Sequence, residues 1–374
     1  RHPSAATTVP ALISLTVQPD PPANATRAAA DDPERLVSDP GVQAAARQLA
    51  SGGLLGLPTE TVYGLAADAG QPDAVRRIFT AKGRPADHPL IVHLPPAWHS
   101  GVDHHALEVP AFARALMDAF WPGPLTLIVP RRPGVAEAAA GGQASVGLRC
   151  PAHPVAQAVL QAAQALGVQG VAAPSANRFG RVSPTTAAHV MQEFETLSAD
   201  ELLVLDGGAC QVGIESTIVD ATRGQPVLLR PGMITADQLS RACGLPVLAP
   251  HELAPTTAAA PKASGTLESH YAPNARVRLM DADTLKQALQ LLGTDVKPGT
   301  IAVYARQRPP GPPNPKKARL AWRPMPGDAA TCAHELFAVL RELDSLGVAL
   351  IWVETPPDSP EWQGVRDRLQ RAAA

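Results

Sequence analysis

The sequence predicts an α/β protein with two domains. From about residue 40 onward, short apolar runs alternate with helical patterns, which is typical of layered α/β folds. The chain has 374 residues, of which 45% are hydrophobic, and this is enough to build two separate cores. A stretch rich in Ala, Pro and Thr after about residue 246 interrupts the alternation, as an interdomain linker would.

The chain is expected to begin with a tail. Residues 1–35 are rich in Ala, Pro and Thr, and their one apolar run, at 9–17, contains a proline and is too short for a signal-peptide core. Such a composition buries too little apolar surface to offset the entropy of ordering. We therefore predict a disordered tail over 1–35, a first domain over 36–245, a linker over 246–273 and a second domain over 274–374.

In the first domain, strands are expected where short apolar runs are bounded by turn residues, and helices where an apolar face begins near a proline. The predicted strands are 54–57, 90–94, 125–129, 145–149, 170–173, 202–205, 215–220 and 226–230, and the predicted helices are 72–79, 154–166 and 184–195.

The second domain is expected to be a small parallel sheet of Rossmann-like type, because its strands and helices alternate. The predicted strands are 275–280, 300–304 and 348–353, the predicted helices are 282–292, 329–345 and 359–373, and 306–319 is predicted to be a surface loop.

Charge and cysteine content exclude several classes of protein. The net charge of −2 provides no global positive field for a nucleic-acid backbone or an anionic membrane, and 4% aromatic residues offer few stacking platforms for bases. No apolar run approaches the roughly 18 residues of a membrane-spanning helix. The four cysteines are widely spaced and form no CxxC pair, so we expect reduced thiols in a cytoplasmic protein.

Two segments carry cations and small hydrogen-bond donors. Lys82 and Arg84, in Lys-Gly-Arg-Pro, follow a predicted helix and can face one pocket, although a solvated pair at a helix C-terminus would give the same pattern. Ser175 and Asn177, in Ala-Pro-Ser-Ala-Asn, follow a predicted strand, where open α/β sheets place ligand contacts. A turn that is rich in Ser and Asn for backbone reasons explains the second segment equally well.

Two further segments combine hydroxyls with single charges. Pro-Thr-Glu-Thr-Val-Tyr-Gly-Leu at 58–65 has several hydroxyls and one acid, which suits a small zwitterion better than a metal; a β-turn before a strand is the alternative. Gly-Ile-Glu-Ser-Thr-Ile-Val-Asp at 213–220 precedes Leu-Leu-Arg-Pro-Gly at 228–232. Arg230 there is either a phosphate clamp or a salt-bridge partner at a strand end.

Together the four segments resemble the YrdC-type threonylcarbamoyl-AMP synthases, in order, over nearly all of residues 40–235. Trp-Pro-Gly-Pro-Leu-Thr at 121–126 and Arg-Cys-Pro-Ala-His-Pro at 149–154 belong to the same series, and His-Tyr-Ala-Pro at 270–273 resembles the long form of the family. The resemblance implies a YrdC-like twisted mixed sheet with flanking helices, plus a smaller Rossmann-like C-terminal accessory domain.

The resemblance also implies a reaction. Enzymes of this family condense L-threonine with bicarbonate to a carbamate, which attacks the α-phosphate of ATP and expels pyrophosphate. A downstream tRNA threonylcarbamoyl transferase complex uses the product. Direct tRNA binding by this chain is expected to be weak or absent because its net charge is acidic and its aromatic residues are few. Such a step requires neutralised phosphates and in-line positioning more than a protein nucleophile. Mg²⁺ is expected to be held mainly by the nucleotide phosphates, with no protein metal site.

Site residues are carried over by motif. The catalytic set is Lys82, Arg84, Ser175 and Asn177; ATP would be bound by Arg84, His88, Ser145, Ser175, Ser183, Arg230 and Tyr271, and threonine by Thr61, His93, Arg149, Ala173 and Ser216. Arg149 suits the amino-acid carboxylate because a guanidinium fork binds it bidentately, and Thr61 and Ser216 suit the threonine hydroxyl.

Two departures from the family pattern carry their own expectations. His88 stands where the family more often has a small amide or hydroxyl residue, so the nucleotide contact there is expected to be altered or pH-dependent. The linker at 264–273 lacks the basic stretch that is usual in the family, which predicts a looser lid around Tyr271.

Three rival functions remain open at this point. A metal hydrolase would use His99, His104 and His105, but their spacing fits no strong zinc pattern and they are predicted to lie in a surface loop. An RNA-binding module without catalysis would show RNA affinity and no turnover. Carbamoyl transfer in hydrogenase maturation uses a similar domain, but those proteins carry cysteine-rich zinc modules that this chain lacks.

Overall fold

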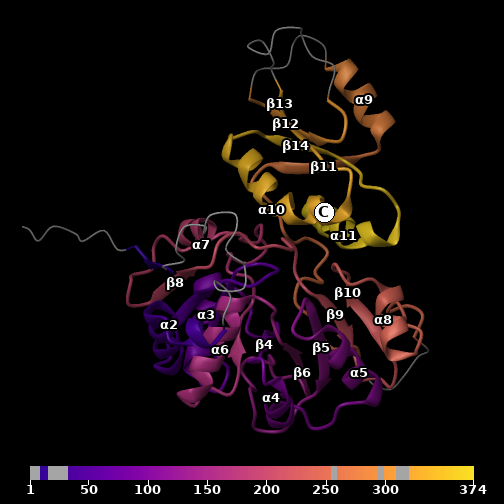
Figure 1. The fold of residues 1–374 in the computed structure, drawn as a ribbon. Coiled ribbons are helices and arrows are strands. Elements are labelled where there is room, and N and C mark those ends of the chain that lie inside the picture. Colours follow the sequence, from indigo (N-terminus) through magenta and orange to yellow (C-terminus); the bar gives the residue numbers. More distant parts are fainter. Residues whose placement is uncertain (1–8, 16–32, 254–258, 293–298, 309–319) are drawn as a thin grey trace, which may run out of the picture.

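Two sheets organise the computed structural model, which describes residues 9–15, 33–253, 259–292, 299–308 and 320–374 (Figure 1). Within these ranges the larger sheet has ten strands in mixed orientation, and the smaller has four strands that are all parallel. The predicted α/β class, with a large mixed sheet and a smaller parallel C-terminal sheet, is confirmed. None of the helices in the described ranges has the length and apolar character that a membrane crossing needs.

The larger sheet follows the order β1-β8-β2-β3-β7-β4-β6-β5-β9-β10. Its strands are β1 (Ala11–Ser14), β2 (Leu54–Leu57), β3 (Gly64–Asp68), β4 (Ile91–His93), β5 (Leu125–Pro130), β6 (Ser145–Arg149), β7 (Val171–Ala172), β8 (Leu202–Asp206), β9 (Thr217–Asp220) and β10 (Val227–Arg230).

Helices cover both faces of this sheet, so its strands are apolar on both sides. Along β8, Leu202 and Val204 pack into one core while Leu203 and Leu205 pack into the other. The core around Leu202 and Val204 includes helices α3 (Pro72–Lys82), α4 (Trp98–His105), α5 (Ala111–Phe120), α7 (Ala187–Glu193) and α8 (Ala236–Cys243). The core on the other face includes α2 (Pro40–Ala50) and α6 (Pro154–Ala165). The short helix α1 (Pro33–Val37) comes before α2 in the chain.

The structure corrects two expectations in the first domain. The predicted tail over 1–35 is wrong for Ala11–Ser14, which form β1 and pair in parallel with β8, and for its last three residues, where α1 begins at Pro33. The alternation of half-buried Ala11 and Ile13 with exposed Leu12 and Ser14 suits an edge strand. Residues 1–8 and 16–32 lie outside the described ranges. The second correction concerns α4, a helix in place of the predicted loop at His99, His104 and His105.

The second domain has the order β11-β14-β12-β13, and helices pack on both faces of its sheet. Its elements are β11 (Arg276–Met280), α9 (Ala282–Leu291), β12 (Ile301–Ala305), β13 (Ala321–Pro324), α10 (Ala329–Ser345), β14 (Leu350–Glu354), a 3-10 turn (Pro360–Trp362) and α11 (Gln363–Ala372). β13 was not predicted, and residues 309–319 of the predicted loop lie outside the described ranges.

The two domains share a core. Helices α10 and α11 lie between the smaller sheet and the first domain (Figure 1). Their buried side chains cluster with Val62, Val182 and Ile214 of the first domain. Because Val62 and Ile214 belong to the motifs at 58–65 and 213–220, and Val182 precedes Ser183, the second domain packs directly behind the candidate site.

Candidate active site

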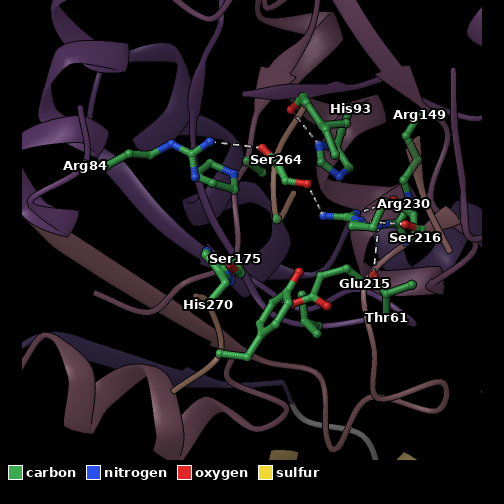
Figure 2. Close-up of a pocket in the computed structure, with 16 residues that line it drawn as sticks. Thr61, Arg84, His93, Arg149, Ser175, Glu215, Ser216, Arg230, Ser264 and His270 are labelled. Atoms are coloured by element: carbon green, nitrogen blue, oxygen red, sulfur yellow. Dashed lines mark hydrogen bonds between the residues drawn. The ribbon is translucent and has the colours of Figure 1, made fainter. Parts of the chain in front are cut away.

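A polar pocket gathers residues from segments far apart in the sequence (Figure 2). It encloses about 450 Å³ of space not filled by atoms, part of it open to solvent. Its lining comprises Thr61, Val62, Arg84, Ile91, His93, Arg149, Ala173, Pro174, Ser175, Glu215, Ser216, Arg230, Ser264, Gly265, His270 and Tyr271. Nine of the predicted site residues are in this set, Arg84, Ser175 and Arg230 among them, whereas Lys82 is not.

Local backbone geometry presents the first two cations. Pro72 begins α3, and Gly83 ends it in the left-handed conformation with φ of 63°, so that the amide of Arg84 donates back to the carbonyl of Phe79 at 3.0 Å. Lys82 Nζ donates to the carbonyl of Ser175 at 2.5 Å and also to that of Asn177. The buried lysine therefore fixes the loop after β7 against the end of α3.

The linker connects the two arginines of the pocket. Arg84 Nη2 donates to Ser264 Oγ at 3.0 Å and to the carbonyl of Pro89 at 2.8 Å. Arg230 Nη1 donates to the carbonyl of Ser264 at 3.0 Å, while its Nε donates to the carbonyl of Ser216 at 3.0 Å. Ser264 thus lies between both guanidinium groups, as Figure 2 shows.

These cations are held away from water. Burial, reinforced by nearby Arg84, lowers the pKa of Lys82 well below its usual value. Burial lowers the pKa of Arg84 to about 10, with Tyr271 opposing the shift and Arg230 adding to it, and burial also lowers the pKa of Arg230. Concentrating desolvated positive charge costs free energy, which an anionic ligand would offset.

Several buried polar atoms have no hydrogen-bond partner among the described residues. They include Arg84 Nε, His270 Nδ1 and Tyr271 Oη on the pocket lining, and Asn177 Oδ1 beside it. Buried polar groups are normally paired, so unpaired atoms gathered at one cavity indicate a polar ligand. Tyr271, which is 1% exposed and has φ of 61°, places its hydroxyl there through a strained backbone conformation.

Arg149 lies at the end of β6 and makes two buried contacts. Its Nη1 donates to Thr61 Oγ1 at 2.9 Å, and its Nη2 lies 2.7 Å from Glu60 Oε1 as an ion pair. Glu60 was not among the predicted site residues, although it is the one acid of the 58–65 motif. His93 lies on the adjacent strand β4, where its Nδ1 is 3.1 Å from the carbonyl of Ile91.

The Ser216 hydroxyl joins the arginine cluster to the first domain's sheet. Ser216 Oγ is 2.7 Å from Thr126 Oγ1 and accepts from Arg230 Nη2 at 3.2 Å. Its neighbour Glu215, also missed from sequence, accepts hydrogen bonds from Ser183 and from Arg368 of the second domain, the latter at 2.8 Å. Ser264, Gly265 and His270 were missed too, although they lie in the linker segment that was singled out around Tyr271.

Five predicted residues lie outside the pocket lining. Lys82 and Asn177 lie directly behind Ser175, and the Ser183 hydroxyl is engaged by Glu215. Ser145 lines an adjoining hollow of about 300 Å³, which shares Ile91 and Ser264 with the pocket. His88 lines neither hollow and packs edge-on against Phe179 with ring centroids 5.4 Å apart.

The donor set around the pocket does not resemble a metal centre. Among the described residues, no group of three His, Cys, Asp or Glu side chains is placed to hold a metal ion. Both carboxylate oxygens of Glu215 are engaged, by Ser183 and Arg368. On α4, His105 is buried with its Nδ1 2.7 Å from the carbonyl of Gly101, and His99 stacks on Trp98. A metal ion in the pocket would therefore depend on ligand oxygens.

Two histidines of the pocket, His93 and His270, should make the folded chain less stable at acidic pH. Burial, with Arg149 adding to it, lowers the pKa of His93 to about 3, and burial lowers that of His270 to about 3. Below the usual histidine range the unfolded chain binds protons that the folded chain does not, so the free energy of unfolding falls as the pH falls. Going from about pH 7 to about pH 5 should remove about 1–2 kcal/mol per histidine.

Urea unfolding at the two pH values measures this loss, with His270→Gln as the comparison. The variant should lose about 1–2 kcal/mol less than the unsubstituted chain over the same interval. An equal loss in both proteins would show that His270 is not held neutral by its surroundings.

Comparison with known proteins covers both domains. A family profile described as Telomere recombination, for Sua5, YciO and YrdC proteins, matches residues 47–232, and the profile Threonylcarbamoyl-AMP synthase, C-terminal domain, matches residues 234–374. The Threonylcarbamoyl-AMP synthase of Pyrococcus abyssi is 35% identical over 89% of this chain and 94% of its own. That of Bacillus subtilis is 34% identical over 91% of this chain and 95% of its own.

Two solved structures of a Sua5 protein also match most of this chain. A structure of P. abyssi Sua5 in complex with L-threonine has a TM-score of 0.76 and 33% identity, covering 89% of this chain and 94% of that one. A second structure of P. abyssi Sua5, with a histidine and the following tyrosine replaced by alanine, has a TM-score of 0.77 and 32% identity, with coverage of 89% and 92%.

Proposed function

Because this chain belongs to the family of threonylcarbamoyl-AMP synthases, we propose that it condenses L-threonine, bicarbonate and ATP to threonylcarbamoyl-AMP and pyrophosphate. In class terms it is a nucleotidyltransferase, because the adenylyl group moves from pyrophosphate to a carbamate oxygen. The observation that carries the proposal is the convergence of Arg84, Arg149 and Arg230 on one pocket.

The arginine cluster around Ser264 suits the polyphosphate. Arg84 and Arg230 line the pocket close together, and Lys82 lies behind Ser175. A chain of phosphates carries several negative charges, and guanidinium groups bind them with directed hydrogen bonds. Lys82, Arg84, Ser175 and Asn177 would stabilise the charge that develops at the α-phosphate, and Ser145, Ser183 and His88 would act at the edge of the nucleotide site.

The opposite wall suits the amino acid. Arg149 would bind the threonine carboxylate, because its fork already reaches the pocket beside Thr61. Thr61 and Ser216 offer hydroxyls to the threonine side chain, and the backbone at Ala173 and the neutral His93 complete this wall. With the carboxylate held there, the carbamate formed on the amino group would face the α-phosphate for in-line attack.

The remaining components follow from this chemistry. Mg²⁺ would be held mainly by the phosphates, since the described residues offer no cluster of ligands for it, and it would supply charge neutralisation. Bicarbonate is the source of the carbamate carbon. The product would pass to a tRNA threonylcarbamoyl transferase complex in the cytoplasm, where the four cysteines, which form no disulfide, would stay reduced.

A pyrophosphate-release assay tests the proposal. Turnover should require ATP, threonine and bicarbonate together, and valine should be a much poorer substrate than threonine. A site that hydrogen-bonds a substrate hydroxyl rejects the analogue without it by about 10⁴-fold, because its own polar groups are left unpaired. Serine, which keeps the hydroxyl, is the matched control. RNA affinity without pyrophosphate release would favour the RNA-binding alternative.

Tyr271→Ala should weaken ATP binding about tenfold. The side chain is 1% exposed, contacts the pocket and packs against Phe337 with ring centroids 5.5 Å apart. Titration calorimetry with Mg-ATP measures the change, and Tyr271→Phe, which removes the hydroxyl alone, separates ring packing from hydrogen bonding. An unchanged dissociation constant in Tyr271→Ala would remove the proposed lid role, including the expectation of a looser lid.

A further inference from the structure

A buried arginine of the second domain reaches the wall of the pocket. Arg368, on α11, is 0% exposed. Its Nε donates to Glu215 Oε2 at 2.8 Å and its Nη2 to the carbonyl of Glu215 at 3.1 Å, while Nη1 donates to the carbonyl of Pro231 at 2.6 Å. One side chain thus holds both the 213–220 motif and the turn after Arg230.

The same guanidinium supports Tyr271. It lies over the tyrosine ring, 5.4 Å from the ring centroid, and Phe337 of α10 stacks on that ring. Arg368 also contacts Asp367 Oδ2 at 3.0 Å. The second domain therefore contacts two residues that line the pocket, Glu215 and Tyr271, through one fully buried cation.

The domains dock too closely for this contact to be incidental. A Cβ atom added to Gly364 of α11 would lie 2.9 Å from the carbonyl oxygen of Gly232. One added to Gly213 would lie 2.3 Å from the carbonyl oxygen of Ala333 of α10. Only glycine allows such approaches, so the two helices sit directly against the loops that carry Glu215 and Arg230.

The Glu215 carboxylate carries a negative charge in a pocket that is proposed to bind phosphates. Its side chain lines the same pocket as Arg84 and Arg230 and is 7% exposed. An unpaired carboxylate there would repel phosphates and compete for the guanidinium of Arg230. Removing one partner of a buried ion pair is costly because the remaining charge is left uncompensated.

We propose that Arg368 is a positioning residue for the nucleotide site: it neutralises Glu215 and holds Tyr271, so that the second domain completes the pocket. The inference rests on the proposed function, in which the pocket binds ATP. It assigns the second domain an electrostatic role in binding the nucleotide, with threonine binding, on the Arg149 wall, affected little.

The test compares Arg368→Met with the double variant Glu215→Gln/Arg368→Met. Calorimetry with Mg-ATP should show the dissociation constant raised at least about tenfold in the single variant, as expected for one uncompensated charge near the phosphates. The double variant, which has no unpaired carboxylate, should recover most of that loss. The KM for threonine should stay within about threefold of that of the unsubstituted enzyme in both.

Arg366→Met is the matched control. Arg366 lies on the same helix, and its side-chain partners among the described residues, Pro357, Ser359 and Asp358, all belong to its own domain. This variant should bind ATP like the unsubstituted chain. If Arg368→Met does not fold, Arg368→Lys and Arg368→Gln replace it. The lysine variant, which keeps the positive charge, should then bind ATP more tightly than the glutamine variant.

The outcomes separate the two proposals. Unchanged ATP affinity in Arg368→Met, or a double variant as weak as the single one, overturns the positioning role even if the enzyme turns over normally. ATP binding with the predicted variant pattern but no threonine-dependent pyrophosphate release supports the positioning role and refutes the reaction. A chain that binds no ATP overturns both.

Discussion

Arg84→Ala should reduce turnover by about 10³-fold or more while leaving the fold intact. Arg84 places its guanidinium in the pocket through the left-handed turn at Gly83, and its Nε has no partner among the described residues. In phosphoryl-transfer chemistry an arginine on the transferring group acts mainly on charge that develops in the transition state. The loss should therefore appear in kcat as well as in the KM for ATP.

Steady-state pyrophosphate release measures the effect, and circular dichroism checks the fold. Arg76→Ala is the control, because Arg76 is on the same helix but is exposed, and within the part of the chain that the structure describes its side chain pairs with Asp73 alone. It should retain full activity. Activity in Arg84→Ala comparable to that of Arg76→Ala would remove the proposed phosphate role of the Lys-Gly-Arg-Pro segment.

Arg149→Lys should lower kcat/KM for threonine about 100-fold. Lysine keeps a positive charge opposite Glu60, so the buried Glu60 carboxylate is not left unpaired. Lysine lacks the planar guanidinium fork that contacts Thr61 and Glu60 at the same time. The KM for ATP should change little, because the arginine cluster around Ser264 remains.

Arg131→Lys is the comparison for this variant. Arg131 is largely buried and donates to the carbonyls of Gln143 and Val135, away from the pocket lining. Arg131→Lys therefore also replaces a buried arginine by lysine, but it leaves the proposed threonine-binding residues unchanged. Equal kcat/KM values for threonine in the two variants would contradict the role of Arg149.

Much of the site was predictable because polar motifs follow regular elements. The strands at 54–57 and 145–149 have the bounds that short apolar runs between turn residues predict. Since Arg149 and Arg230 end strands and Lys82 ends a helix, a correct placement of those elements brings the motifs to one edge of the sheet. Five of the nine predicted residues in the pocket lining, Thr61, His93, Arg149, Ala173 and Ser216, were assigned through the family resemblance and not through the placement of elements.

Other elements had no local signal. β3 (Gly64–Asp68) contains no β-branched or aromatic residue, yet all five residues are buried between β2 and β7. Its strand conformation depends on tertiary packing, which overrides weak propensity. The short edge strand β1 lies within a composition that is typical of disorder, and its pairing with β8 depends on residues nearly 200 positions away.

The ion pair between Arg368 and Glu215 could not be predicted from the sequence either. The sequence of α11 has three arginines, at 366, 368 and 371, and nothing in their spacing shows which one is buried. Gly364, one helical turn before Arg368, lies close to the turn at Gly232, where a Cβ atom would be 2.9 Å from the Gly232 carbonyl oxygen. Long-range contacts of this kind decide which charges face a site, and the sequence pattern carries no record of them.

A crystal structure with L-threonine and a non-hydrolysable ATP analogue would show whether both substrates occupy one pocket. The phosphates should lie against Arg84, Arg230 and Ser175, with the threonine carboxylate on Arg149 and its amino group facing the α-phosphate. A nucleotide bound on the second domain's sheet, or threonine and phosphates on separate surfaces, would refute a shared site for the two substrates.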